Sequence, residues 1–336
     1  MKVFVLKFLV LFSLIIGYFT WYRIAVYPNI CGELDVLGQI PFGPEYKERL
    51  DSIYPHGEKL VVDETSFSSS YRITTIGDSF SGQGILGYQQ FLGEIEGDTI
   101  QNIKGEGTPE QTFITLLNSD AIPKGTCVIV ESVERSMIKR LCNLDFTAKF
   151  DGITNRPSSV DNDKMTPLEG AMSKLRIVLG YKNPIRRYNT TEDLFTHKKR
   201  HNQLYLFDSP WESYKFGIDG DFVFRYLSEK DFEDAYVNLM KIKQKADEKD
   251  VNLIYLIAAD KYEVYEPFVM EKHPHNPTLD KCPKEFWLIN TKPLLQELAL
   301  DGVKDVYRID DTHWSPIGAK IVAEEIARRL TFENEY

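Results

Sequence analysis

The chain has 336 residues, of which 43% are hydrophobic and 12% aromatic, and its formal net charge is -10. This composition supplies enough apolar side chains for a large buried core, which excludes an intrinsically disordered protein. The negative charge, without any dense run of lysine or arginine, argues against a surface that binds nucleic acid. We therefore expect a globular protein whose partners are not nucleic acids.

The first part of the chain is an apolar run. Between Val3 and Tyr22 the only charged residue is Lys7, and about 20 apolar residues are enough for a helix to span a bilayer. We therefore predict a transmembrane anchor over residues 1–23, with a cleaved signal peptide as the alternative. Lys2 and Lys7 lie at the amino end of this run and only Arg23 follows it, so we expect the remaining chain on the extracytoplasmic side, in the periplasm or at the cell surface.

The remaining chain alternates between strand and helix patterns. Residues 24–70 contain many glycines and prolines, which indicates an irregular lead-in. Helical patterns are clearest over residues 229–249 and 315–330. Strands that are apolar throughout and alternate with helices are typical of a parallel sheet covered on both faces. We therefore predict a three-layer α/β/α sandwich over residues 71–336, with five parallel strands over residues 71–77, 98–103, 127–132, 251–259 and 303–309.

One region departs from this alternation. Residues 143–224 are mostly polar, and only residues 168–180 show a helical pattern. A loop of this length rarely lacks structure of its own, so we predict an insertion with local structure. The sequence leaves open whether the insertion binds substrate or only decorates the fold.

A serine follows the first predicted strand, in the sequence IGDSFS over residues 76–81. Open parallel sheets bind ligands beyond the carboxyl ends of their strands, and Ser79 lies at such an end. A helix beginning near Gly82 is expected to direct backbone N–H groups toward it. Ser79 is therefore a candidate nucleophile, although the same residue types also occur in ordinary turns.

A candidate base follows the last predicted strand, in the sequence RIDDTHWSPIG. His313 precedes the predicted C-terminal helix, for which Ser315 is the expected N-cap. An imidazole beside Asp310 and Asp311 can act as a general base whose second nitrogen is oriented by a carboxylate. The carboxyl ends of parallel strands meet at one edge, so we predict that Ser79 and His313 form one site, with Ser79 Oγ and His313 close enough to hydrogen bond once the looseness of an empty site is allowed for.

These two motifs, GDSFS and DTHWSPIGA, resemble those of the SGNH hydrolase superfamily, which has a flavodoxin-like fold. The closer resemblance is to the branch of the alginate O-acetylation proteins of the AlgJ and AlgX type, with an Asp-x-His-Trp (DHHW-type) signature. The resemblance implies that Ser79 is the nucleophile, His313 the base and Asp311 the orienting acid. In the more general Asp-x-x-His pattern, the acid is Asp310.

The resemblance also implies an oxyanion hole. The second sequence motif of the superfamily contains a glycine after the second strand, whose N–H helps to bind the oxyanion. In this chain that glycine is Gly107, with Gly105 as the alternative. Where the superfamily has an asparagine, this chain has Arg135, as in the alginate branch. Arg135 is expected to stabilise an oxyanion or bind an acidic sugar; the alternative is a salt bridge with Glu131 or Glu134.

Other polar or aromatic residues do not indicate a second site. Trp314 is expected to seat its loop on the core, and residues 260–262 are expected to form an ordinary capping loop. His273 and His275 lie in a loop-like stretch and are expected at the surface, and no cluster of residues indicates a metal site.

The resemblance implies an extracytoplasmic O-acetyltransferase that modifies a polysaccharide through an acyl-serine, without a cofactor. The acetyl group is then expected to come from a multipass membrane acyltransferase. A carbohydrate esterase with the same triad is the alternative, because both reactions share the acyl-enzyme. A glycan-binding protein without activity is the third possibility.

Overall fold

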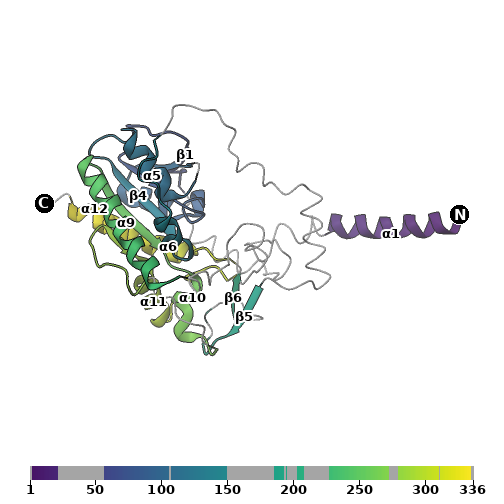
Figure 1. The fold of residues 1–336 in the computed structure, drawn as a ribbon. Coiled ribbons are helices and arrows are strands. Elements are labelled where there is room, and N and C mark those ends of the chain that lie inside the picture. Colours follow the sequence, from purple (N-terminus) through teal and green to yellow (C-terminus); the bar gives the residue numbers. More distant parts are fainter. Residues whose placement is uncertain are drawn as a thin grey trace.

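The three-dimensional structure is a computed structural model, drawn in Figure 1. It describes residues 2–21, 57–105, 107–149, 185–192, 194, 203–207, 227–271, 279–309 and 311–333.

A six-stranded parallel sheet forms the centre of the fold, in the order β1-β3-β2-β4-β7-β8. The predicted α/β class with a parallel sheet is confirmed, but the predicted number of five strands is wrong. The strands are β1 (Val61–Glu64), β2 (Ile73–Ile76), β3 (Ile100–Ile103), β4 (Cys127–Val133), β7 (Asn252–Ala258) and β8 (Leu288–Asn290).

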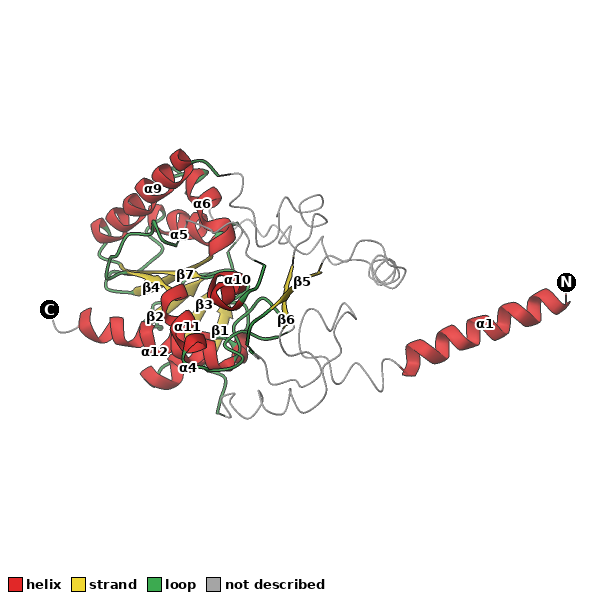
Figure 2. Cartoon of the chain, turned by 90° about the horizontal axis from the view of Figure 1, so that it is seen from below, coloured by secondary structure: helices red, strands yellow, loops and turns green. Residues whose placement is uncertain are grey.

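Helices cover both faces of this sheet (Figure 2). On one face lie α5 (Pro109–Asn118), α6 (Glu134–Cys142) and α9 (Glu229–Glu248). On the other lie α4 (Tyr88–Glu96), α11 (Thr291–Leu300) and α12 (Pro316–Glu333). This arrangement is the predicted three-layer sandwich.

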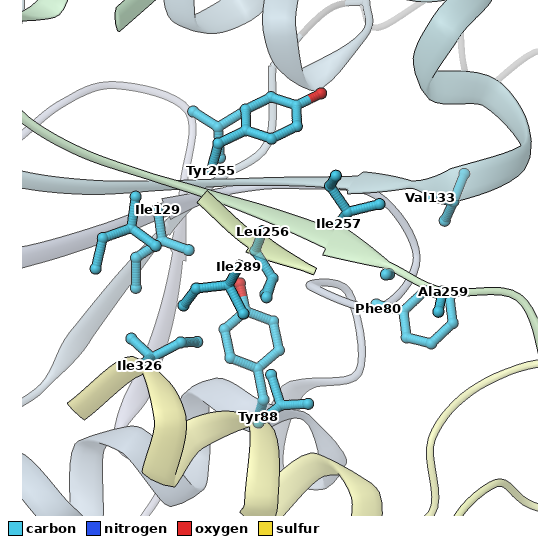
Figure 3. Close-up of a cluster of buried hydrophobic side chains, with 14 of the residues drawn as sticks. Phe80, Tyr88, Ile129, Val133, Tyr255, Leu256, Ile257, Ala259, Ile289 and Ile326 are labelled. Atoms are coloured by element: carbon cyan, nitrogen blue, oxygen red, sulfur yellow. The ribbon is translucent and has the colours of Figure 1, made fainter. Parts of the chain in front are cut away.

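Burial on both faces explains why the strands are apolar throughout. Every residue of β2, β3 and β4 is buried, and β7 is buried after its first residue. Figure 3 shows the alternation along β7: Tyr255 and Ile257 lie on one face of the sheet and Leu256 on the other. Such strands are stable because side chains of both faces leave water.

The predicted strand over residues 303–309 is wrong. Asp305 has a φ of 57°, a left-handed conformation that interrupts an extended run. Only an isolated antiparallel bridge, between Tyr307 and Trp314, forms in this segment. Two short strands that the sequence does not predict, β1 and β8, complete the sheet instead. Because β1 begins at Val61, the lead-in is not irregular throughout.

The helix patterns over residues 229–249 and 315–330 are confirmed as α9 and α12. Ser228 caps α9 through a capping box with Asp231. At the start of α12, the N–H of Ile317 donates to Ser315 Oγ at 3.1 Å, and Pro316 occupies the first helical position. Ser315 therefore fixes the point at which the His313 loop ends and the helix begins.

The described parts of the polar insertion contain a two-stranded antiparallel sheet, β5 (Ile185–Asn189) and β6 (Gln203–Phe207). It packs against a short helix that follows β7, α10 (Lys261–Tyr265), where the rings of Tyr188 and Tyr262 lie 5.8 Å apart. Local structure in the insertion is therefore present. The helix predicted over residues 168–180 lies outside the described residues.

A helix, α1 (Lys2–Trp21), covers the apolar run at the N-terminus. Among the residues that the structure describes, no helix is long and apolar enough to cross a membrane. The predicted transmembrane helix is therefore not found.

Candidate active site

Ser79 lies in a turn that directly follows β2, at the carboxyl edge of the sheet. The N–H of Gly82 donates to the Ser79 carbonyl at 3.1 Å, and the N–H of Ser81 donates to the Asp78 carbonyl at 3.0 Å. The Ser79 residue is exposed. A ligand can therefore reach this serine from solvent, at the edge where open parallel sheets bind ligands.

The helix predicted from near Gly82 is wrong. A short 3-10 helix, η3 (Gly84–Leu86), comes first, and α4 begins only at Tyr88. Gly84 has a φ of 57° and Gly87 is extended, so neither residue continues an α-helix. The turn around Ser79 is therefore held by side chains rather than by a helix N-terminus.

The carboxylate of Glu131, on β4, holds this turn. Its Oε2 accepts hydrogen bonds from the N–H of Asp78 at 2.7 Å, the N–H of Ser81 at 3.2 Å and Ser81 Oγ at 3.0 Å. A Cβ at Gly77 would lie 2.6 Å from the same oxygen and 2.1 Å from Ser81 Oγ. The glycine that precedes Asp78 is therefore needed so that the backbone can approach Glu131.

Glu131 is fully buried, and this changes its protonation. Burial raises the pKa of Glu131, and the charge of nearby Asp78 raises it further, to about 8; the hydrogen bonds oppose this rise. Its other oxygen, Oε1, is buried without a hydrogen-bond partner in the described part of the chain. Near neutral pH the side chain therefore holds a proton, while Oε2 accepts from the turn.

Asp78 has a structural partner of its own. The guanidinium of Arg140, on α6, binds both of its carboxylate oxygens, with Nη2 at 2.9 Å from Oδ1. The N–H of Val133 donates to Oδ2 at 2.9 Å. These bonds join the serine turn to the end of β4 and to α6, so the Asp78 side chain is occupied in holding the turn.

His313 lies in a narrow, hairpin-like loop before α12. The N–H of Arg308 donates to the His313 carbonyl at 3.1 Å, and the N–H of Ser315 donates to the Val306 carbonyl at 3.0 Å. His313 is buried. The loop therefore holds the imidazole inside the protein, with its backbone fixed on both sides.

Asp311 is the carboxylate that contacts His313. Its Oδ1 lies 2.6 Å from His313 Nδ1 and also accepts from the backbone N–H of His313 at 3.1 Å. Burial raises the pKa of Asp311, but the hydrogen bonds and charge of His313 and the charge of Arg308 outweigh it and lower the pKa to about 2. An ionised carboxylate only accepts, so a proton lies on Nδ1; in the neutral imidazole, Nε2 is then the nitrogen that carries the lone pair. Asp310, the other candidate acid, lies outside the described residues.

Phe80 brings the two motifs together. Its ring centroid lies 4.8 Å from that of His313 and 4.5 Å from that of Trp314. Because Phe80 directly follows Ser79, this packing places the serine turn against the histidine loop. Trp314 is itself buried and donates from Nε1 to Tyr307 Oη at 3.1 Å, which confirms that it seats the loop on the core.

The expected hydrogen bond between Ser79 and His313 is not formed. Within the described residues, Ser79 Oγ has no hydrogen-bond partner, and His313 Nε2 is buried without one. Hydrogen bonds between catalytic groups often form only when a substrate is bound. The structure thus shows a hydrogen-bonded Asp311–His313 pair next to the turn that carries the Ser79 hydroxyl.

The two candidate oxyanion-hole glycines lie on the adjacent strand end. In the sheet, Ile76 at the end of β2 pairs with Ile103 at the end of β3, and Gly107 follows Ile103 by a few residues. Gly107 has a φ of 120°, which favours glycine. Neither its N–H nor that of Ser79 donates to another described residue. At Gly105, a Cβ would lie 2.3 Å from Thr112, so this glycine is needed for packing.

The Arg135 side chain, the third candidate for binding an oxyanion or an acidic sugar, is engaged in an ion pair. Its Nη1 forms an ion pair with Oδ1 of Asp260, the residue before α10. This pair favours the salt-bridge alternative, although the partner is neither Glu131 nor Glu134. Asp260 is buried, so the expected capping loop over residues 260–262 is wrong: these residues belong to the interior.

The sequence patterns do not predict the roles of Glu131 and Lys261, both buried. The position of Glu131 could have indicated its role, because this carboxylate lies inside a largely apolar strand. Charged residues are almost never fully buried without partners, so a buried hydrogen-bonding role follows. Lys261 is likewise a buried charged residue, and it follows the end of the largely buried strand β7 after two residues.

Comparisons with models of protein families, with curated proteins and with solved structures found no match to this chain.

The Glu131→Gln variant tests how the serine turn is held. The carboxyl titrates ordinarily at 4.5 but at about 8 in the folded protein. The folded state thus holds a proton that the unfolded state releases, so the contribution of Glu131 to stability is full below about pH 4.5 and is lost as pH rises through about 8. Glutamine offers the same acceptor oxygen and does not ionise.

We therefore expect the melting temperature of Glu131→Gln, relative to wild type, to increase from pH 5 to pH 9 by roughly 2 °C or more. Calorimetry at both pH values measures this difference. Glu94→Gln, at an exposed carboxylate, is the control. A Glu131→Gln difference that does not vary with pH would contradict a buried, proton-holding carboxyl.

Proposed function

We propose that the protein is an SGNH-type O-acyltransferase, which acetylates a polysaccharide through an acyl-Ser79 intermediate. The observation that carries this proposal is the buried Asp311–His313 pair, at 2.6 Å, beside the turn that presents Ser79. A nucleophile, a base and a carboxylate that orients the base are the parts that acyl transfer needs. The resemblance of both motifs to the alginate O-acetylation branch supports the same assignment.

In the first step, Ser79 Oγ attacks the carbonyl carbon of an acetyl ester, and its proton passes to His313 Nε2. The bond between the acyl carbon and the donor oxygen breaks, and this oxygen takes the proton from Nε2. Asp311 stabilises the imidazolium that forms between the two transfers. The free N–H groups of Ser79 and Gly107 are the proposed donors to the oxyanion.

In the second step, a sugar hydroxyl attacks the acetyl-Ser79 carbonyl carbon while its proton passes to Nε2. The bond to Ser79 Oγ breaks, and Oγ recovers the proton. These steps use side-chain and backbone groups of the chain alone and need no cofactor. A multipass membrane acyltransferase is the proposed source of the acetyl group, and the polysaccharide is the acceptor.

A carbohydrate esterase is the second candidate, because water can replace the sugar hydroxyl in the second step. The exposure of Ser79 is the observation that favours it, since an exposed acyl-serine is open to water. A glycan-binding protein without activity is the third candidate. The oriented imidazole of His313 argues against this third candidate, because binding alone does not require an oriented base.

The choice between transfer and hydrolysis is tested with an activated acetyl ester. We expect the protein to form acetyl-Ser79, to release it slowly to water and to transfer it faster to a suitable oligosaccharide. Mass spectrometry of the intact protein and of the sugar measures both. Ser79→Ala is expected to lose several orders of magnitude in rate. If the acetyl group is released quickly to water and no oligosaccharide accepts it, the protein is an esterase and not a transferase.

The identity of the acid is tested by Asp311→Asn and Asp310→Asn. Asparagine at position 311 favours the wrong imidazole tautomer, so we expect the rate of Ser79 acetylation to fall by about 10⁴-fold. Asp310→Asn is the matched control and is expected to stay within about threefold of wild type. The opposite ranking in single-turnover kinetics would assign the acid to Asp310.

The location of the protein is part of this proposal. In α1 the described large apolar side chains are 44% to 66% exposed, and they lie on all sides of the helix: Phe8, Val10, Leu11, Phe12, Leu14, Ile15, Ile16 and Tyr18. Lipid is the proposed partner of this surface, with the active site on the extracytoplasmic side.

Cell fractionation tests this location. We expect the full chain to sediment with membranes and a chain without residues 1–23 to be released. Added protease should reach the active-site domain of the full chain from the extracytoplasmic side. A full-length protein found in the soluble fraction would contradict the assignment.

A further inference from the structure

A buried ammonium lies directly behind the histidine loop. Lys261, the first residue of α10, is 1% exposed. Its Nζ donates to the backbone carbonyls of Arg308 at 2.5 Å, Ile309 at 3.0 Å and Asp311 at 3.1 Å. An ammonium has three N–H donors, so it can donate to all three carbonyls at once.

These carbonyls belong to a segment without regular secondary structure. Arg308, Ile309 and Asp311 are themselves buried, and a buried carbonyl needs a donor from somewhere. Lys261 supplies a charged one, and hydrogen bonds to charged groups are stronger than those between neutral groups. The loop is thus held from α10 by a charged donor, in addition to Tyr265 Oη, which accepts from the N–H of Tyr307 at 3.2 Å.

Asp311 is held at two points as a result. Lys261 binds its backbone carbonyl, and the Nδ1 and backbone N–H groups of His313 bind its carboxylate. When the carbonyl is fixed, rotation of the residue about its backbone is restricted. The carboxylate is then directed toward the imidazole.

The helix that carries Lys261 is itself anchored on several sides. Asp260, which precedes it, pairs with Arg135 and donates its N–H to Glu134 Oε2 at 2.9 Å. Glu263 pairs with Lys292 of α11 at 2.8 Å. Lys261 therefore joins the loop to a helix whose own position is fixed by contacts with α6 and α11.

We infer that Lys261 is a positioning residue, whose ammonium holds the carbonyls of residues 308, 309 and 311 so that Asp311 and His313 form their hydrogen bond. Its link to catalysis rests on the proposed function; its link to the Asp311–His313 pair does not. Within the described part of the chain, Lys261 Nζ binds backbone carbonyls and contacts neither Ser79 nor the imidazole, so it takes no part in proton transfer.

The test compares Lys261→Met with Lys245→Met in the full chain. Methionine keeps the unbranched apolar stem and removes the ammonium. Lys245, on α9, is a matched control because it is a partly buried lysine that donates to Asn118 Oδ1 at 3.0 Å, and within the described residues it contacts neither α10 nor the histidine loop. The first readout is the low-field proton resonance of the Nδ1 proton shared by His313 and Asp311. The second is the rate at which a fluorophosphonate labels Ser79.

We expect Lys261→Met to lose or shift the resonance and to slow labelling by about 10²-fold, the effect typical of a misplaced catalytic group. Lys245→Met should retain both even if its melting temperature falls equally. An unchanged resonance in folded Lys261→Met would overturn the inference. If wild-type protein is not labelled at Ser79, the proposed function fails, while the resonance still decides the role of Lys261.

Should Lys261→Met not fold, the wild-type protein gives the answer. Ammonium protons bound to three buried carbonyls exchange slowly with water, so nitrogen-edited NMR should show the Lys261 Nζ protons with slow exchange. Exchange as fast as that of exposed lysines would overturn the inference.

Discussion

Two loops that are distant in the sequence meet at one edge of the sheet because two buried ionisable side chains hold their backbones. Glu131, on β4, accepts three hydrogen bonds from the turn that carries Ser79. Lys261, after β7, donates three to the loop that carries His313. β4 and β7 are neighbours in the sheet, so the distance between the loops is set by strand pairing. Phe80 then closes the contact by packing against His313 and Trp314.

This arrangement divides the site into a rigid part and an accessible part. His313 and Asp311 are buried and joined by a hydrogen bond, whereas Ser79 is exposed. For His313 as the proposed base, a fixed position limits the reorganisation that proton transfer requires. The exposure of Ser79 leaves room for a large substrate to reach its hydroxyl. The hairpin formed by β5 and β6 packs on α10, so the insertion rests on the helix that also holds the histidine loop.

The sequence was sufficient for those features that depend on hydrophobic periodicity and capping. The strands at residues 73–76, 100–103, 127–133 and 252–258, the helices α9 and α12, and the cap at Ser315 lie where the patterns predict them. It was insufficient where tertiary contacts override a local preference. The β-branched run after Val303 is broken by the left-handed Asp305. The strand β1 ends in two acidic residues, Asp63 and Glu64, and β8 has only three residues, so neither shows an apolar run.

The same division applies to the site. Ser79, His313 and Asp311 were predicted from their motifs, and the structure shows the contact between the last two. The partner of Arg135 was not predictable, because it comes from the end of a strand that is distant in the chain. Asp260 meets Arg135 because each lies two residues beyond a pair of strand residues, Ala258 and Val133, that face each other in the sheet. Pairing between distant strands creates such contacts, and local sequence does not encode it.

The central claim is that Ser79 and His313 act on one acyl group, and a crystal structure of the protein after reaction with a fluorophosphonate tests it most directly. We predict a phosphorus bonded to Ser79 Oγ, His313 Nε2 within hydrogen-bond distance of the adduct, and a phosphonyl oxygen that accepts from the N–H groups of Ser79 and Gly107. An unmodified Ser79, or an adduct out of reach of His313, would contradict the account.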